Sequence, residues 1–290
     1  MTQTVLLIGA TGRIGQSLLD ELAPDHAAAR LRVRVGVRSE KSRQLVLARG
    51  LDVCEVDVDR PATLDPAMKG ADAVFHLRPY TFRQLMHGKL AADAAKRCGV
   101  RHVVTLGAFG RPETPHAVIA WNFLVEAYVE RMMGTGWTHL QPNYFMDNVL
   151  VQRDPASATL FNRITVPVSW IAASDIAAVA AAVLRDPKRH AGKIYPLAEQ
   201  AADAKQIAAW MSEITGRRHG TAVPPREKMM ERLLAQGREP DYAAALVDYV
   251  DAVSRGEVPE IAQTFDTVRT VTGRAPVSFR DFLQRHLKPA

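Results

Sequence analysis

A glycine-rich segment near the N-terminus has the clearest potential for chemistry. It reads GATGRIG over residues 9–15 and follows an apolar run over residues 5–8. Glycines at this spacing let backbone N–H groups approach a pyrophosphate, and a helix that begins there adds the positive end of its dipole. Glycines also serve ordinary tight turns, but a strand before them and a helix after them favour dinucleotide binding. The residues predicted to hold the phosphates are Gly9, Thr11, Gly12, Arg13, Ile14 and Gly15.

The residues that follow the second predicted strand indicate which dinucleotide is bound. An NAD-binding protein would place Asp or Glu there to accept from the ribose hydroxyls. This chain has Arg38 instead, with Lys41 close behind it. A guanidinium suits a 2′-phosphate and can stack on adenine, although Arg38 could also be a solvated surface residue. The nearest acid, Glu40, is expected in the first turn of the next helix, where acids are favoured. We therefore expect NADP(H) as the cofactor.

Further candidate cofactor residues end the third and fourth predicted strands. Asp57 and Val58 follow the third strand, and Asp57 could accept from the adenine amino group or only cap a turn. The fourth strand ends at His76, Leu77 and Arg78. These three residues should lie next to the path of the nicotinamide half, because ligands bind at the carboxyl ends of parallel strands.

Short apolar runs alternate with amphipathic stretches over the first 140 residues. Strands are expected over residues 5–8, 31–37, 51–56, 73–77, 103–106 and 137–140. Helices are expected over residues 13–23, 40–49, 61–69, 82–97 and 117–133. Such alternation with short loops produces right-handed βαβ units and a parallel sheet. The predicted fold is an α/β, doubly wound parallel sheet (a Rossmann fold).

The pattern changes after residue 142. One strand is expected over residues 193–197, together with helices over residues 174–185, 203–215, 225–236, 239–255 and 278–287, the first of them capped by Ser174. We therefore predict an NAD(P)-binding domain over residues 1–150, whose sheet is rejoined by about residues 165–198. Residues 151–290 are predicted to form a smaller, mostly helical substrate-binding lobe.

Composition and charge exclude several classes of protein. The chain has 290 residues, of which 47% are hydrophobic and 23% charged, so it is neither disordered nor fibrous nor a disulfide scaffold. The net charge is +6, but the basic residues are scattered, so nucleic acid is not expected as the primary partner. Two cysteines and a short N-terminal apolar run favour a cytoplasmic protein with no membrane segment. No spacing of histidines predicts a metal site.

The chain resembles the NmrA-like branch of the atypical short-chain dehydrogenases/reductases. The segments that carry the resemblance are GATGRIG, VGVRSEKS, EVDVD, GADAVFHL, GVRHVVTLGAFG and LQPNYFMDN, with Asp175 in WIAASDIAAV. The similarity runs over most of the chain. It implies a relation to NADPH-dependent quinone, triphenylmethane-dye and azo-dye reductases. The same branch also includes transcriptional co-regulators that bind the dinucleotide without turning it over.

The chain departs from the wider superfamily where carbonyl chemistry takes place. Those enzymes place Ser or Thr after the fifth strand and Tyr-x-x-x-Lys on the following helix. Here Gly107 follows the strand, Asn122 stands at the lysine position, and Val118 stands at the tyrosine position. Reversible alcohol dehydrogenation is therefore not expected. Hydride transfer to an electron-poor acceptor needs mainly that cofactor and acceptor are stacked at reacting distance.

The remaining site candidates are aromatic or polar residues that could line an acceptor pocket. The candidate catalytic residues are His116, Asn122 and Tyr144, of which His116 or Tyr144 could donate a proton. Asn143, Tyr144 and Phe145 are expected to position the nicotinamide, and Tyr80, Trp121 and Phe145 to contact the substrate. His116 could equally begin a helix at the surface, and Tyr144 or Phe145 could serve packing alone.

Two functions follow from these observations. The first is an NADPH-dependent reductase of a small aromatic, conjugated acceptor such as a quinone, an azo dye or a triphenylmethane dye, working as a monomer or homodimer. The alternative is a non-catalytic NADP(H) sensor that acts through a protein partner, which the missing Tyr–Lys pair motivates. Turnover of the cofactor distinguishes the two.

Overall fold

The computed structural model describes residues 2–287, and the chain divides into two compact units. Within the described residues, the first comprises residues 2–108, 121–141 and 176–195, and the second comprises residues 109–120, 142–175 and 196–287. Each unit is thus assembled from three separate segments of the chain. The division predicted from the sequence, near residue 150 with the sheet rejoined by about residues 165–198, stays a prediction.

A seven-stranded sheet, in the order β3-β2-β1-β4-β5-β6-β11, forms the centre of the first unit. Every neighbouring pair from β3 to β6 is parallel. These elements confirm the predicted doubly wound α/β fold, including the return of the chain to the sheet after residue 165. The strands are β1 (Gln3–Ile8), β2 (Leu31–Val37), β3 (Asp52–Glu55), β4 (Ala73–His76), β5 (His102–Leu106), β6 (Trp137–Pro142) and β11 (Lys193–Leu197).

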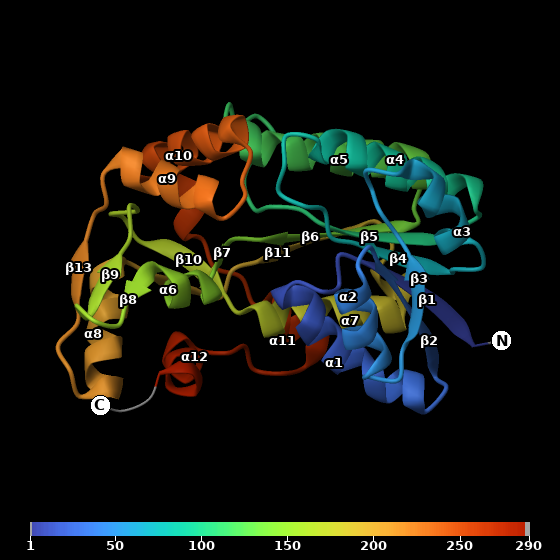
Figure 1. Ribbon diagram of the computed structural model, residues 1–290, viewed down its shortest axis with the longest axis horizontal. Coiled ribbons are helices and arrows are strands. Elements are labelled where there is room, and N and C mark those ends of the chain that lie inside the picture. The colour runs from blue at the N-terminus through green and yellow to red at the C-terminus, as the bar shows by residue number, and fades with distance from the viewer. Residues whose placement is uncertain (1, 288–290) are drawn as a thin grey trace. The chain divides into compact units, whose positions relative to one another are not determined.

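Helices lie on both faces of this sheet, which explains why its central strands β1 and β4 are almost continuously buried. In β1, only Gln3 is not buried, and Val5, Leu6 and Leu7 have no exposed surface. Figure 1 shows α3, α4 and α5 on one side of the sheet and α1, α2 and α7 on the other. These helices are α1 (Arg13–Ala27), α2 (Glu40–Leu47), α3 (Leu64–Met68), α4 (Gln84–Arg97), α5 (Ala117–Met133) and α7 (Ala173–Arg185).

The order of the strands defines where a ligand can enter. From β1 the chain moves outward to β2 and β3, and it then returns to place β4 on the other side of β1. The helices after β1 and β4 therefore leave toward opposite faces, which opens a crevice at the carboxyl ends of these two strands. The last residues of the two strands, Ile8 and His76, are paired directly.

Most elements of the first unit lie where the sequence predicts them. The strands over residues 31–37 and 193–197 and the helix over residues 117–133 agree to the residue. α1 is longer than predicted, because Pro24 lies in its last turn, where a missing N–H removes only one helical hydrogen bond. Ser174 does not cap α7, which begins one residue earlier, at Ala173.

The second unit contains the four helices predicted after residue 200, together with two short helices and short strands that were not predicted. Its helices are α6 (Asp147–Gln152), α8 (Ala204–Thr215), α9 (Arg226–Ala235), α10 (Pro240–Ser254), α11 (Thr267–Thr272) and α12 (Phe279–His286). Two three-stranded sheets have the orders β12-β10-β7 and β13-β9-β8. Their strands are β7 (Tyr144–Phe145), β8 (Arg153–Asp154), β9 (Thr159–Phe161), β10 (Val168–Ile171), β12 (Gln200–Ala202) and β13 (Gly220–Ala222). Strands of two to four residues are too short to show an alternating pattern.

The packing of α1 on β1 generates a prediction about stability. A Cβ on Gly15 would overlap the backbone of Ala10, so Gly15→Ala must push the helix away from the strand. We expect a loss of about 1–3 kcal/mol in the free energy of unfolding, measured by urea denaturation. Gly12→Ala is the matched control, because a Cβ there meets no atom nearer than 3.9 Å, and it should cost less than about 1 kcal/mol. Equal losses in the two variants would contradict this account of the packing.

Candidate functional site

The turn between β1 and α1 places three glycines under three different constraints. Gly9 has φ +82°, a left-handed conformation that favours glycine. A Cβ on Gly9 would also lie 2.5 Å from the carbonyl oxygen of Leu77, so the turn packs directly against the residue that follows β4. Gly15 allows the close packing of α1 on Ala10. Gly12 meets neither constraint and leaves open space at the N-cap of α1, where a ligand can approach the backbone.

The first turn of α1 suits an anion. Among the described residues, no side chain caps the helix at Gly12, and no acidic residue lies in its first turn. Helix N-terminal N–H groups without a cap attract negative charge, and the helix dipole adds to that attraction. Arg13 contributes a cationic side chain at the first position of the helix. The predicted phosphate residues thus form a turn with the donors that a pyrophosphate needs.

Arg38 and Asp57 lie close together at the ends of neighbouring strands. Arg38 follows β2 and is exposed, and its charge contributes to lowering the pKa of Asp57. Lys41 is exposed in the first turn of α2. Glu40 lies in the same turn, and its carboxylate accepts from Gln44 Nε2 at 2.6 Å. The acid nearest to Arg38 in the sequence is therefore engaged within its own helix, as the sequence analysis expected.

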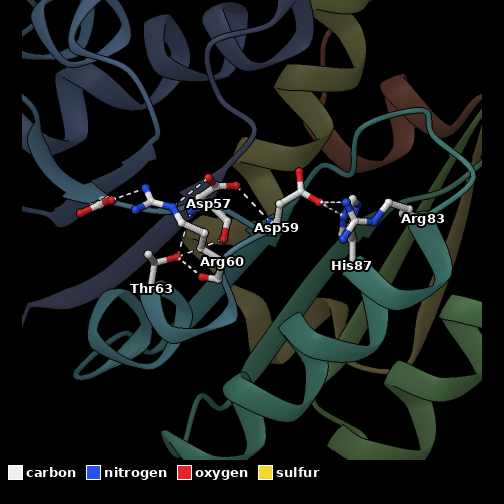
Figure 2. A network of polar contacts seen from close by, with 7 residues as sticks. Asp57, Asp59, Arg60, Thr63, Arg83 and His87 are labelled. Carbon is white, nitrogen blue, oxygen red and sulfur yellow. Dashed lines mark hydrogen bonds and ion pairs between the residues drawn. The ribbon is translucent and has the colours of Figure 1, made fainter. Parts of the chain in front are cut away.

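A polar network orders the loop that follows β3, as Figure 2 shows. Asp57 accepts from the Asp59 N–H at 3.0 Å and from Arg60 Nε at 3.1 Å. Thr63 Oγ1 accepts from the Asp57 N–H at 2.9 Å. Burial raises the pKa of Asp57, but these hydrogen bonds and the charges of Arg60 and Arg38 outweigh it and bring the pKa below its ordinary value. The carboxylate of Asp57 is thus ionised and holds the loop.

The same network reaches α4 through Asp59. Its Oδ1 is 2.9 Å from Arg83 Nη1 and 3.0 Å from His87 Nε2, so the loop after β3 is fastened to the start of α4 (Figure 2). Val58, between the two aspartates, packs against the apolar cluster between the sheet and α3–α5. The role of Asp57 and Val58 in binding adenine stays a prediction.

The residues that follow β4 meet both β1 and α5. The Leu77 N–H donates to the Ile8 carbonyl at 3.1 Å. Arg78 is buried, and its Nη2 donates to Asn122 Oδ1 at 2.8 Å. Burial, and then the nearby charges of Arg78 and His87, lower the pKa of His76 to about 3, so this ring is neutral. The structure therefore brings together four of the predicted site residues: His76, Leu77, Arg78 and Asn122.

Glu126, which the sequence analysis did not select, belongs to the same group. It lies one helical turn after Asn122 and is 3% exposed, and its Oε2 accepts from Gln141 Nε2 at 2.7 Å. A Cβ on Gly107 would overlap the other oxygen, Oε1. Burial raises the pKa of Glu126 to about 7, against the opposing effects of the Gln141 hydrogen bond and the Arg78 charge.

A signal for Glu126 is present in the sequence. The buried residues of α5 recur at helical spacing, and they include Val118, Val125 and Val129. Asn122 and Glu126 fall on this same stripe, where a polar side chain must be desolvated. Polar residues on the apolar face of a helix are candidates for a site, and the helical periodicity alone could have identified Glu126.

Three of the predicted nicotinamide residues lie in the second unit, directly after β6. Asn143 Nδ2 donates to Ser169 Oγ at 2.7 Å and to the Ile261 carbonyl at 2.8 Å. Its Oδ1 accepts from the Tyr144 N–H at 3.0 Å. Phe145 pairs with Ile171 in the sheet of β7 and β10. The Asn143 side chain therefore fastens its own segment, and the contact of these residues with nicotinamide stays a prediction.

Tyr144 and His116 share a neighbour, Tyr249 of α10. The rings of His116 and Tyr249 meet edge to face with centroids 5.3 Å apart. Burial, and then the proximity of Tyr249, raise the pKa of Tyr144 well above its ordinary value, so the phenol keeps its proton. Tyr249 was missed because an aromatic residue on an amphipathic helix is usually ordinary core. The assignment of Tyr144 or His116 as proton donor is still untested.

The other predicted substrate residues lie in the first unit. The Trp121 ring meets Phe82 edge to face with centroids 5.0 Å apart, and Phe82 is 53% exposed. Tyr80 precedes Phe82 in the loop between β4 and α4. Phe82 is thus an aromatic neighbour that the sequence analysis did not select. Contact of Tyr80, Trp121 and Phe145 with a substrate stays a prediction.

Over residues 2–287, no group of three or more His, Cys, Asp or Glu side chains is placed to hold a metal ion. In the same residues, no helix is both long enough and apolar enough to cross a membrane.

Known structures of the same fold include two reductases. The triphenylmethane reductase of Citrobacter sp., complexed with NADP(H), superimposes with a TM-score of 0.82 at 19% identity and covers 98% of this chain and 100% of its own. The NADPH-dependent quinone oxidoreductase of Escherichia coli, complexed with NADPH, gives a TM-score of 0.82 at 20% identity and covers 97% of this chain and 99% of its own. At these identities the likeness establishes the fold.

Sequence comparison establishes the family. The NAD(P)H azoreductase of Xenophilus azovorans is 30% identical in an alignment 289 positions long, which covers 97% of this chain and 97% of the azoreductase. The model of the NmrA-like family matches residues 1–268. The chain therefore belongs to the NmrA-like family, as its motifs indicate.

Proposed function

We propose that this protein is an NADPH-dependent oxidoreductase that transfers hydride to a small aromatic, conjugated acceptor of the azo, quinone or triphenylmethane type. The observation that carries the proposal is the β1–α1 turn. It combines a left-handed Gly9, an open helix N-terminus at Gly12 and the exposed Arg38 after the neighbouring strand. Such a turn suits a pyrophosphate, and the arginine suits a 2′-phosphate.

The relatives support the same reaction class. The azoreductase that is 30% identical to this chain is named for its use of NAD(P)H, and the two reductases with the same fold carry NADP(H) and NADPH in their structures. The three are named as an azoreductase, a triphenylmethane reductase and a quinone oxidoreductase. We therefore propose a substrate of this class for the present chain.

Each part of the dinucleotide has candidate residues on this chain. The N–H groups at the start of α1 would bind the pyrophosphate, and Arg38 with Lys41 would bind the 2′-phosphate. Asp57 and Val58 would flank the adenine. On the other side of the crevice, the segment from His76 to Arg78 would lie against the nicotinamide half, because it packs on Gly9 and continues from β4.

The proposed chemistry does not require a Tyr–Lys pair, at whose positions the sequence analysis places Val118 and Asn122. When bound, the cofactor supplies the hydride, so the protein needs mainly to orient cofactor and acceptor and to keep water away. Arg78, which follows β4, donates to Asn122 of α5, and the two form a buried hydrogen-bonded pair. The buried phenol of Tyr144 keeps its proton, which suits a donor to a reduced acceptor.

Turnover is the first test of this function. Purified protein is mixed with NADPH and a panel of azo dyes, quinones and triphenylmethane dyes, and the loss of the NADPH absorbance is followed, with NADH as the control. We expect consumption with at least one class of acceptor, and faster consumption with NADPH than with NADH. Tight NADPH binding without consumption across the whole panel would contradict the reductase and favour the sensor.

Arg38→Ala tests whether Arg38 recognises the 2′-phosphate. The loss of a charge-assisted hydrogen bond should weaken NADPH binding by about 10- to 100-fold, while NADH binding should change by less than about twofold. Dissociation constants for both dinucleotides are measured by isothermal titration calorimetry. Arg32→Ala is the matched control, because Arg32 lies on β2, the strand that Arg38 follows, but is paired with Asp52 at 2.6 Å. An equal loss of affinity for NADPH and NADH would show that Arg38 does not recognise the 2′-phosphate.

A further inference from the structure

A buried acid, Glu126, and a buried cation, Arg78, lie near each other in the first unit, and no salt bridge joins these two described residues. Arg78 is 4% exposed, and within residues 2–287 its Nε and Nη1 have no hydrogen-bond partner. Glu126 is 3% exposed, and its Oε1 likewise has no partner in that part of the chain. The charges of Arg78 and Glu126 nevertheless influence one another, so the two groups lie near each other. Buried polar atoms are almost always satisfied, so these open donor and acceptor atoms need an explanation.

The structure holds Glu126 firmly in this position. Gln141 donates to Oε2 at 2.7 Å, and the absence of a side chain at Gly107 makes the room that Oε1 occupies. A carboxyl group in such a place is costly to ionise unless a positive charge approaches it. The protonation state of the Glu126 carboxyl group therefore responds to a charge placed near its unpartnered Oε1.

This pair lies at the ligand-binding edge of the sheet. Arg78 follows β4, Gly107 follows β5, and Gln141 lies near the end of β6. These are the carboxyl ends of successive parallel strands, where ligands of doubly wound sheets bind. The β1–α1 turn at Gly9 packs against Leu77, so the phosphate end of a dinucleotide would lie next to this region.

We propose that Glu126 distinguishes the two redox states of the cofactor by exchanging a proton. It would hold a proton beside the neutral, reduced nicotinamide and release that proton when the positively charged, oxidised nicotinamide is bound. This inference rests on the proposed binding of a nicotinamide dinucleotide. It assigns Glu126 and Arg78 a role in cofactor preference that goes beyond holding the cofactor in place.

The charge balance of the site gives the physical reason. Arg78 is a permanent cation, because a guanidinium is not deprotonated in a protein. A second positive charge on the nicotinamide would be repelled unless a negative charge appears nearby. Ionisation of Glu126 supplies that charge, and the released proton carries the excess away. The pKa of about 7 raised by burial means that Glu126 can exist in either form at neutral pH.

The other titratable groups around Glu126 do not account for such a proton. His76 of β4 and His139 of β6 have pKa values lowered to about 3, mainly by burial, and both are neutral from pH 6 to pH 8. Glu130 follows one turn later on α5 and disfavours the ionised form of Glu126. From the remaining packed elements, Gly107 and Gln141 contribute no titratable group.

The test measures the affinity for NADPH and NADP⁺ between pH 6 and pH 8 by isothermal titration calorimetry. Running each titration in two buffers of different ionisation enthalpy counts the protons released. For the wild-type protein we expect proton release on binding NADP⁺ but not on binding NADPH. The ratio Kd(NADP⁺)/Kd(NADPH) should fall by about tenfold from pH 6 to pH 8. The 2′-phosphate titrates near pH 6 in both dinucleotides, so it cancels in this ratio.

Three variants make the assignment specific. Glu126→Gln keeps the size of the side chain but cannot ionise, so proton release and the pH dependence of the ratio should disappear. Glu130→Gln removes the neighbouring acid on the same helix and should retain the proton release. Gly107→Ala keeps the carboxyl group but displaces Oε1, so the midpoint of the pH dependence should move. This third variant tests the proposal independently if Glu126→Gln does not fold.

The outcomes separate this inference from the proposed function. If neither dinucleotide binds, the proposed function is wrong, and the inference is overturned with it. If both bind but their ratio does not change with pH, the proposed function stands and the role of Glu126 is overturned. Wild-type pH dependence in folded Glu126→Gln, or an unchanged midpoint in folded Gly107→Ala, also overturns it. Loss of the pH dependence in Glu126→Gln alone, with retention in Glu130→Gln, supports it.

Discussion

The contact between Gly9 and the carbonyl of Leu77 is the constraint on which the arrangement of the site depends. It joins the turn after β1 to the segment after β4, the two strands between which the chain reverses its direction across the sheet. Any side chain at Gly9 would separate them. With the two segments in contact, the start of α1 and the Arg78–Asn122 pair belong to one continuous edge of the sheet, where the phosphates and the reactive end of one ligand can be bound together.

The sequence was sufficient to predict this part of the molecule because its signals are local. A buried parallel strand is a continuous apolar run, as in Val5–Ile8, and the glycines of the turn follow it directly. The assignment of Glu40 to the first turn of α2 also followed from local preference. The ends of helices were predicted less accurately where a rule has exceptions. Proline usually ends a helix, but α1 tolerates Pro24 in its last turn.

The rest of the candidate site and the second unit depend on contacts between residues that are distant in the sequence. Glu126, Gln141 and Gly107 become neighbours only because three successive strands end at the same edge, and nothing in one helix shows which strand residue will meet its acid. The small sheets of the second unit were missed for a similar reason. β7 has two residues, and it is defined by pairing with β10, more than 20 residues later, rather than by a pattern of its own. Tyr249 becomes a candidate site residue only because it lies near His116 and Tyr144.

The space shared by Gly107 and Glu126 limits which residues can stand at these two positions. After β5, the carboxyl group of Glu126 occupies the volume that the Cβ of any residue other than glycine at position 107 would need. A substitution that introduced a serine at position 107 would meet a buried acid unless position 126 had changed first. The two positions are therefore coupled, and a larger residue at position 107 fits this packing once a smaller side chain stands at position 126.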